Sequence, residues 1–352
     1  MGLPVLLVAD ARGLARSAAA LVKGFVEFDP DVHIAGVVLN RVGSERHARL
    51  LKEAVEQGAG VEVLGCVRRG GGWEMPGRHL GLVPAWEAAG ARETIKAIAS
   101  QVRDELNLDR LMELAHCARE LPEQAPEIFP DGARDYTKKN TVIAVARDDA
   151  FCFYYQDNLD LLEAQGARIV EFSPLKDRGL PEGTGAVWLG GGYPELHARA
   201  LAANGAMLEA LRAAAARNMP IFAECGGYMY LAEAIVDSEG ACYPMAGILP
   251  GTAVMGSRLA ALGYCTARLR DAGFFGPAGT ELGGHVFHWC RMEGAGNSAA
   301  LESDGTLLGA VRNQVLGSWL HVHFASNPLA AAHFVEAGGM FFSVQKKTWK
   351  QT

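Results

Sequence analysis

The chain lacks the features that mark membrane, secreted and disulfide-rich proteins. No apolar run approaches the roughly 18 residues that span a bilayer. The N-terminus has no basic start followed by a small-residue cleavage site. The seven cysteines are scattered without a CxxC pair, and their odd number argues against a disulfide framework or a zinc cluster. We therefore expect no membrane segment, and a reducing, cytoplasmic location.

Basic residues are also fewer than acidic ones. Lys and Arg number 33 against 40 Asp and Glu, which gives a net charge of −7, so no nucleic-acid-binding surface is expected. The hydrophobic share of 49% and the charged share of 21% are those of ordinary globular proteins. A length of 352 residues suggests two domains, each large enough to bury its own core.

The order of apolar runs and helical patterns predicts parallel sheets covered by helices, an α/β fold, in both halves. In the first half, apolar runs at 3–9, 34–39 and 61–67 alternate with helical patterns at 15–28 and 45–57, and one helix is expected over 91–118. Residues 120–140 are rich in Pro, Glu, Asp and Lys, which indicates a linker. The second half predicts strands at 141–146, 168–172, 186–189, 219–223 and 317–324, and helices at 155–165 and 204–217. We expect domains at 1–119 and 141–345.

Cys225 stands where a predicted strand turns into a helix, in the sequence PIFAECGGY at residues 220–228. A thiol at such a turn faces the positive end of the helix, which lowers its pKa and favours the thiolate. The N–H of Gly226 can donate to a developing oxyanion. The pattern favours a nucleophile; the alternative is a small buried core cysteine.

A glycine-rich turn, LGGGYPE at residues 189–195, follows another apolar strand. The backbone N–H groups of Gly191 and Gly192 can supply a second oxyanion donor. An ordinary structural turn is the equally weighted alternative. Neither Lys-Ser nor Lys-Thr follows, so the turn is not a phosphate loop.

Two histidines lie two residues apart in the expected strand 317–324. The period of a strand places His321 and His323 on one face. One can then activate the thiol while the other orients it. For a single histidine, a packed core residue would be the better interpretation, but the pair and the cysteine turn together favour function.

Together these segments resemble the cobyrinic acid a,c-diamide synthases, a family of cobalamin-type class I glutamine amidotransferases. The resemblance covers nearly the whole chain. It rests on residues 189–195, 223–231 and 320–328, and in the first half on VADARG (8–13), GVVLNRV (36–42) and RHLGL (78–82). It implies two three-layer α/β/α domains: a partial P-loop ATPase-like domain, similar to dethiobiotin synthetase, over 1–119, and a class I glutamine amidotransferase-like domain over 141–345.

The resemblance implies a ligase that uses glutamine, ATP and Mg²⁺ to convert the a and c carboxylates of cobyrinate, a corrin-type macrocycle, into amides. Hydrogenobyrinate and nickel-sirohydrochlorin are alternative macrocycles. Cys225 would form the glutamyl thioester, and His321 would take and return the proton. Gly226, Gly191 and Gly192 would hold the oxyanion. Glutamine hydrolysis needs no cofactor, and its ammonia would pass to the ATPase domain, where each carboxylate is activated as an acyl phosphate.

The main departure from the family is the missing Walker A loop, GxxxxGK[ST], since the chain contains no Gly-Lys dipeptide. The backbone cradle and the lysine that hold the ATP phosphates are then absent. A truncation, an internal start and a split enzyme are all compatible with this. We expect this chain alone to be a glutaminase at most. One alternative function is a glutaminase or binding subunit that needs a separate P-loop ATPase chain, and another is a different Cys–His hydrolase. A homodimer is the alternative to such a separate partner chain.

Few residues of the ATPase half can be assigned. Asn40 follows the strand that contacts adenine in dethiobiotin synthetase-like folds; a strand-end cap is its alternative. Asp10 is a candidate Mg²⁺ ligand, with a solvated turn as the alternative. Arg12 and Arg16 are candidate partners for macrocycle carboxylates, or an exposed helix start. His79 lies in a matching segment and has no assigned role.

Further departures concern the second half. Val286 stands where the family usually carries Glu, which bears on macrocycle or interdomain contacts. His285 and His288 resemble a pair of metal ligands, but their spacing suits a helix and no third ligand is evident, so no metal is expected there. Many class I glutaminases place Glu two residues after the catalytic histidine, where this chain has His323. A Cys–His dyad is therefore the minimal prediction.

Overall fold

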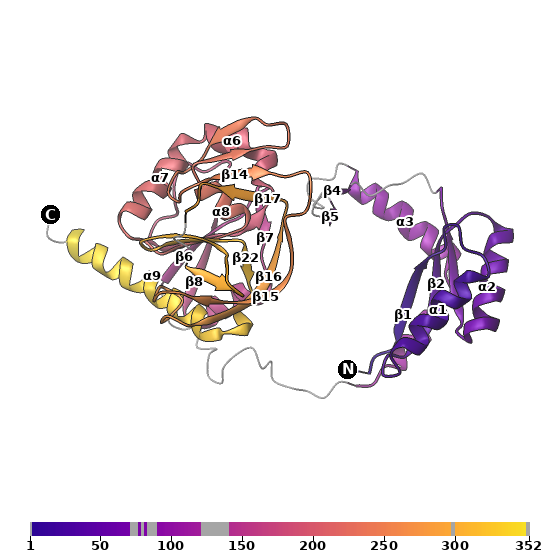
Figure 1. The fold of residues 1–352 in the computed structure, drawn as a ribbon. Coiled ribbons are helices and arrows are strands. Elements are labelled where there is room, and N and C mark those ends of the chain that lie inside the picture. Colours follow the sequence, from indigo (N-terminus) through magenta and orange to yellow (C-terminus); the bar gives the residue numbers. More distant parts are fainter. Residues whose placement is uncertain are drawn as a thin grey trace. The chain divides into compact units, whose positions relative to one another are not determined.

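The computed structural model describes residues 2–70, 77–78, 81–82, 90–120, 141–296 and 300–349. The chain divides into two compact units, 1–124 and 125–352, which Figure 1 shows in sequence colours. Of the expected linker 120–140, only residue 120 belongs to the described part. His79 also lies outside the described residues.

The first unit is built on a parallel three-stranded sheet in the order β1-β2-β3. Its strands are β1 (Val5–Asp10), β2 (Ile34–Val42) and β3 (Val63–Arg68), and its helices are α1 (Ser17–Phe28), α2 (Glu45–Ala59), α3 (Ala91–Glu105) and α4 (Leu108–His116). The short strands β4 (Gly77–Arg78) and β5 (Gly81–Leu82) pair with each other.

Neighbouring residues of β2 point to opposite faces of this sheet, as the period of a strand requires. Val37 and Leu39 pack in one buried cluster with side chains of α1 and α2. Val38 packs in another, which Leu111 and Leu114 of α4 join. The unit therefore has three layers, with the sheet in the middle.

The single helix expected over 91–118 is wrong, because the chain breaks it between α3 and α4. Leu106 is extended and forms a β-bridge with Gly65. The N–H of Asn107 donates to the Leu64 carbonyl at 2.7 Å, and its side chain accepts the N–H of Arg110. Pairing with the sheet edge thus outweighs the helical periodicity, and a polar cap starts a second helix.

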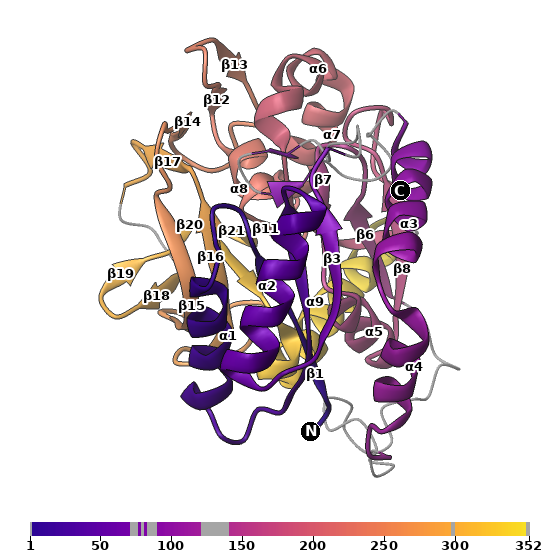
Figure 2. The same cartoon turned by 90° about the vertical axis from the view of Figure 1, so that its right-hand side faces the viewer.

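The second unit contains a six-stranded sheet in the order β20-β21-β11-β9-β6-β8, parallel except for β20. Its strands are β6 (Thr141–Ala146), β8 (Ala167–Phe172), β9 (Thr184–Leu189), β11 (Ile221–Glu224), β20 (Gly309–Arg312) and β21 (Val315–Ser318). Helices α6 (Ala198–Ala203), α7 (Gly205–Ala216) and α8 (Gly226–Leu231) contribute to the core on one face. Helices α5 (Gln156–Ala164) and α9 (Pro328–Trp349) cover the other, as Figure 1 and Figure 2 show.

Three smaller sheets complete this unit. An antiparallel five-stranded sheet has the order β19-β18-β15-β16-β22, with bounds Thr306–Leu307, Leu301–Ser303, Ala261–Leu269, Glu281–His288 and Leu320–Val322. A four-stranded sheet joins β13 (Cys242–Pro244), β12 (Ala234–Val236), β14 (Thr252–Met255) and β17 (Cys290–Glu293). Strands β7 (Phe151–Phe153) and β10 (Gly191–Gly192) form a pair. Two 3-10 helices are η2 (Pro194–His197) and η3 (Phe324–Ser326).

The strand expected over 317–324 is also wrong as a single element. The chain leaves the six-stranded sheet after Ser318 and enters the five-stranded sheet at Leu320, so β21 and β22 belong to different sheets. His321 lies within β22, whereas His323 lies just beyond it.

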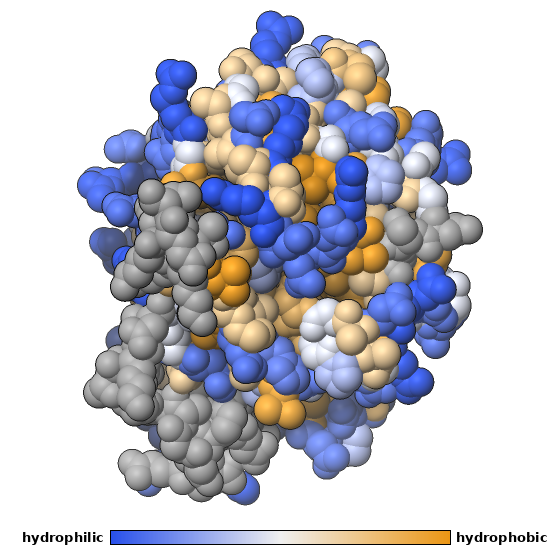
Figure 3. Space-filling view, turned by 90° about the vertical axis from the view of Figure 1, so that its left-hand side faces the viewer, coloured by the Kyte–Doolittle hydropathy of each residue, from blue (hydrophilic) through white to orange (hydrophobic). Residues whose placement is uncertain are grey.

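No helix of the described part is long and apolar enough to cross a membrane. Figure 3 shows one face of the molecule, on which hydrophilic residues surround scattered apolar patches.

Candidate active site

Cys225 occupies a strained turn between β11 and α8. Its φ of 45° is unusual for a residue with a Cβ, and such strain persists only where the surroundings impose it. Here the Cys225 N–H donates to the Ser318 carbonyl at 2.7 Å, and the Cys225 carbonyl accepts the N–H of Met229 at 3.0 Å. These bonds tie the turn to β21 on one side and to α8 on the other. The turn expected from the sequence is therefore present.

The expected lowering of the Cys225 pKa is wrong for the free protein. The side chain is only 5% exposed. Burial, with smaller contributions from the nearby Glu195 and Glu224 carboxylates, raises the pKa of the Cys225 thiol to about 12, although the Gly226 N–H acts in the opposite direction. Desolvation outweighs the field of the short helix. The thiol is therefore protonated at neutral pH and needs a base.

His321 lies in β22 and is 6% exposed. Burial, and then the neighbouring His285 and His288, lowers the pKa of His321 to about 3. Its imidazole is consequently neutral at physiological pH and able to accept a proton. A Cβ on Gly191 would come within 2.4 Å of His321 Cε1. The glycine-rich turn at residues 189–195, here called the glycine loop, therefore leaves room for this ring.

The glycine loop and the cysteine turn are in contact through their backbones. The Gly227 N–H donates to the Gly190 carbonyl at 3.0 Å. A Cβ on Gly226 would lie 3.1 Å from the nitrogen of Gly192, and a Cβ on Gly227 would lie 2.2 Å from the Leu189 oxygen. Glycines therefore allow this approach, which places the backbone nitrogen of Gly192 close to Gly226.

The sequence did not indicate the roles of two polar residues that fix β22. Glu224 is buried, and its carboxylate accepts the Val322 N–H at 2.8 Å. Burial raises the pKa of this carboxyl to about 8, although the Val322 amide and the Trp188 indole act to lower it. The Asn158 side chain donates to the Val322 carbonyl at 2.6 Å and accepts the Phe324 N–H at 2.7 Å. A charged residue in an otherwise apolar strand was the available signal for Glu224.

His323 is partly exposed, whereas Cys225 and His321 are buried. Its Nε2 is 3.8 Å from Asp157 Oδ2, and its ring packs on Tyr155 at a centroid distance of 4.8 Å. His321 instead has His285 against its ring, with the centroids 4.6 Å apart. An orienting role for His323 stays a prediction, and the structure adds His285 as a second candidate.

The helical interpretation of the spacing between His285 and His288 is wrong, because both lie in β16. His288 stacks on Trp319 at 4.1 Å, and its Nδ1 lies 2.6 Å from the Cys290 carbonyl. In the described part of the chain, no three His, Cys, Asp or Glu side chains form a metal-binding group. Val286, between the two histidines, packs against both hydrophobic cores of the unit.

In the first unit, the nucleotide-site candidates meet at the carboxyl ends of adjacent strands, where Asp10 of β1 pairs with Asn40 of β2. Asp10 accepts the Arg12 N–H and forms an ion pair with Arg41, both at 3.0 Å. The Arg12 N–H foremost, and then Arg41, lowers the pKa of Asp10. Asn40 accepts the Arg41 N–H at 2.8 Å. Arg12 and Arg16 are exposed before α1. Among the described residues, no group of three His, Cys, Asp or Glu side chains gathers here.

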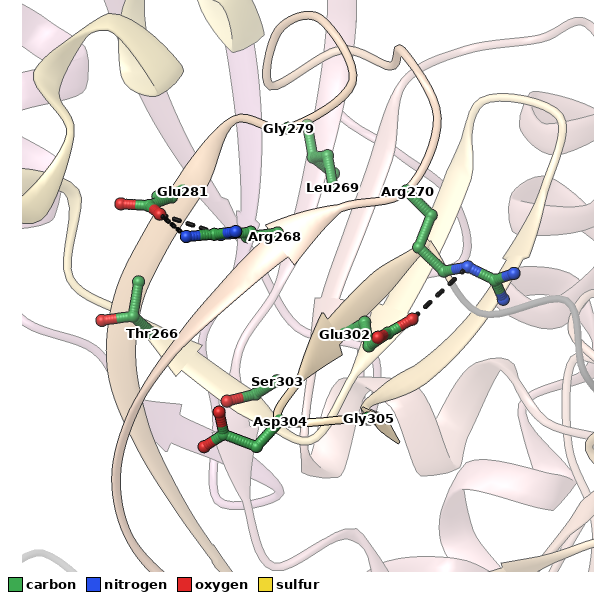
Figure 4. Close-up of a pocket in the computed structure, with 10 residues that line it drawn as sticks. All are labelled: Thr266, Arg268, Leu269, Arg270, Gly279, Glu281, Glu302, Ser303, Asp304 and Gly305. Carbon is green, nitrogen blue, oxygen red and sulfur yellow. Dashed lines mark hydrogen bonds and ion pairs between the residues drawn. The ribbon is translucent and has the colours of Figure 1, made fainter.

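A separate hollow of about 620 Å³ lies over β15, β16 and β18 and does not include the dyad. Figure 4 shows both of its arginines pairing with glutamates. Arg268 pairs with Glu281 at 2.7 Å, and Arg270 with Glu302 at 3.7 Å. Asp304 also lines the hollow and belongs to neither of these pairs.

The second unit contains a glutamine amidotransferase domain. Residues 142–329 match the CobB/CobQ-like glutamine amidotransferase domain, and residues 4–82 match the CobQ/CobB/MinD/ParA nucleotide binding domain. A cobyrinate a,c-diamide synthase of Dehalococcoides mccartyi is 40% identical over 97% of this chain and 75% of its own length. That of Salmonella typhimurium is 40% identical over 96% of this chain and 74% of its own length.

The chain belongs to the cobyrinate a,c-diamide synthase family, and it is a glutamine-dependent amide ligase in type. It spans about three quarters of the length of these relatives. Among solved structures, PurLQS from Thermotoga maritima aligns over 58% of this chain and 99% of that chain, with 14% identity and a TM-score of 0.39. That likeness is too weak to bear on function.

Proposed function

We propose that residues 141–345 form a glutaminase domain in which Cys225 is the nucleophile and His321 is its base. The observation that carries this is the convergence of three backbone segments. The strained cysteine turn is bonded to Ser318, the glycine loop lies against the turn, and the ring of His321 lies against that same loop. A buried thiol with a raised pKa and a neutral imidazole that both adjoin the glycine loop are suited to proton transfer in step with attack.

In the proposed reaction, Cys225 Sγ attacks the side-chain amide carbon of glutamine while His321 takes the thiol proton. The amides of Gly192 and Gly226 hold the oxyanion, with Gly191 as a further donor in the loop. His321 then gives the proton to the leaving nitrogen, which departs as ammonia and leaves a glutamyl thioester. Water attacks the thioester with His321 again as base, and glutamate and the free thiol are restored.

The ammonia serves amidation of a carboxylate, for which the names of the relatives suggest the a and c positions of cobyrinate. In this proposal, residues 1–119 form part of an ATP-using domain, and 120–140 link it to the glutaminase. Asn40 is the candidate adenine contact, and Arg12 and Arg16 are candidates for macrocycle carboxylates. Asp10, at the carboxyl end of β1, is the candidate carboxylate ligand for a Mg²⁺ bound together with ATP phosphates.

A second function, as a subunit that pairs with a P-loop ATPase chain or with a second copy, is favoured by β1. This strand is at the edge of the three-stranded sheet. Val8 is 60% exposed and Leu6 is 37% exposed, although both belong to an apolar run. An unpaired apolar edge strand is suited to pairing with another chain.

Glutamate release from glutamine by the purified chain, with and without ATP and Mg²⁺, tests both proposals. We expect release that is indifferent to ATP and is abolished in Cys225→Ala and in His321→Ala. Release that persists in Cys225→Ala would overturn the assignment. If the intact chain releases no glutamate, the assay is repeated with a full-length relative's P-loop segment added in trans. Restored glutamate release would support the function as a subunit. A continued lack of release would contradict both proposals.

A further inference from the structure

His285 and His321 form a cross-strand stack. The two residues lie directly opposite each other on the antiparallel strands β16 and β22. Their ring centroids are 4.6 Å apart and the rings are inclined by only 13°. A Cβ on Gly284 would come within 2.1 Å of the His321 carbonyl oxygen, so glycine at that position allows the strands to approach this closely.

The outer ring of the stack is held from a third element. Tyr155, which precedes α5, places its hydroxyl 2.9 Å from Nδ1 of His285. When the hydroxyl donates, the proton of neutral His285 is on Nε2. Partial burial lowers the pKa of His285, which favours that neutral form. Tyr155 is thus placed to fix both the orientation and the tautomer of His285.

The ring of His321 receives no comparable hydrogen bond. In the described part of the chain, its interactions are the stack with His285 and its packing against neighbours such as Gly191. A catalytic base commonly needs a partner that holds its ring, usually a carboxylate. The position two residues later is His323, which packs on Tyr155.

We propose that His285 is a positioning residue for His321, held in its stack by the Tyr155 hydroxyl. The proposal rests on the proposed glutaminase function. The near-parallel stack holds the His321 ring in one orientation while it takes the thiol proton, and burial together with the proximity of His285 keeps His321 neutral until then. The other titratable groups around the stack are Tyr155, Tyr264, His288, His323 and Glu224.

The test compares variants that remove one feature at a time in the full chain. His285→Ala removes the stack, His285→Phe keeps an aromatic face without nitrogens, and Tyr155→Phe removes only the hydroxyl. Tyr264→Phe is the matched control, because Tyr264 lies opposite His285 on β15 and is 93% exposed. Steady-state kcat and KM for glutamine hydrolysis are measured across pH, together with the NMR titration of His321.

We expect kcat to fall about 100-fold in His285→Ala with little change in KM, as misplacement of a catalytic group does. The acid limb of the pH profile should move to higher pH, because the ring that desolvates His321 is gone. Compared with His285→Ala, His285→Phe should recover much of kcat, and its acid limb should stay at low pH. Tyr155→Phe should lose about 5-fold, in line with one hydrogen bond. Tyr264→Phe should match the unmodified chain.

Unchanged kcat and pH profile in both His285→Ala and Tyr155→Phe would overturn the positioning role while leaving the glutaminase intact. If the chain hydrolyses no glutamine, the proposed function fails separately, and the NMR titration of His321 still reports whether His285 governs its ring. If His285→Ala does not fold, His285→Phe and Tyr155→Phe decide. If the variants lose kcat only in proportion to their loss of Tm, the effect is one of stability, and this outcome would contradict the proposal.

Discussion

The carboxylate of Glu224 accepts the backbone N–H of Val322 at 2.8 Å. This buried hydrogen bond joins the residue before Cys225 to the residue after His321, and therefore the six-stranded sheet to the five-stranded one. Cys225 follows a strand of the first sheet and His321 lies in the second, so their separation depends on this connection.

Glu224→Ala should lower both stability and activity. The variant leaves the buried Val322 N–H without its acceptor, which costs about 1–3 kcal/mol. We expect a lower Tm and a reduced kcat for glutamine hydrolysis, since β22 carries His321. Glu224→Gln keeps an acceptor oxygen and is the control. Equal loss in both variants would contradict the role given to the hydrogen bond from Val322.

The raised pKa of Glu224 predicts a stability that falls as pH rises. The folded state keeps the carboxyl proton up to about pH 8, whereas the ordinary value of 4.5 applies on unfolding. The folded state thus binds more protons between these values, and stability is lost as pH increases across the window. Thermal denaturation at pH 5 and pH 8 should show this decline in the unmodified chain and a smaller one in Glu224→Gln. Parallel curves would contradict the assignment.

Cys225 should react slowly with iodoacetamide at neutral pH. Because burial raises the pKa of this thiol, the thiolate fraction is small, and the rate should climb through pH 8–10 without a plateau. Mass spectrometry identifies the modified peptide, and Cys225→Ala gives the background from the exposed Cys117 and Cys242. A plateau near pH 7 would instead reveal a preformed thiolate–imidazolium pair.

Gly191→Ala should reduce kcat with a modest loss of stability. The added methyl group would lie 2.4 Å from His321 Cε1, so the ring must move. A displacement of about 1 Å in a catalytic group can cost about 100-fold. Gly205→Ala is a matched control, because nothing lies within 4 Å of its Cβ at the start of α7. Normal kinetics in Gly191→Ala would show that the loop tolerates a larger residue and that His321 does not depend on it.

ATP with Mg²⁺ should leave the Tm of this chain unchanged. The chain has no Gly-Lys dipeptide, and the described residues do not form a metal site, so the phosphates find no cradle. Differential scanning fluorimetry with millimolar ATP tests this, with Asn40→Ala beside the unmodified chain. A rise in Tm that disappears in Asn40→Ala would show adenine binding without a phosphate loop.

The sequence indicated much of the fold and the strand-to-helix turn at Cys225. Short-range patterns define the strands that lead into Cys225 and Gly191, and glycine at such turns has a local physical reason. The predictions from the sequence are wrong where contacts between distant segments outweigh the local pattern. A β-bridge from Leu106 to Gly65 breaks one expected helix, and the transfer of the chain between two sheets at Trp319 breaks one expected strand.

By itself, the sequence determined the α/β class, the cysteine turn, the glycine loop and the family, because these depend on residues close together in the chain. Only the tertiary structure decided the protonation of the site. Burial of Cys225 and His321 outweighs the field of a short helix, and no local pattern records desolvation. It also decided that His285 faces His321, since that pairing depends on strand register between residues 36 positions apart, 285 and 321.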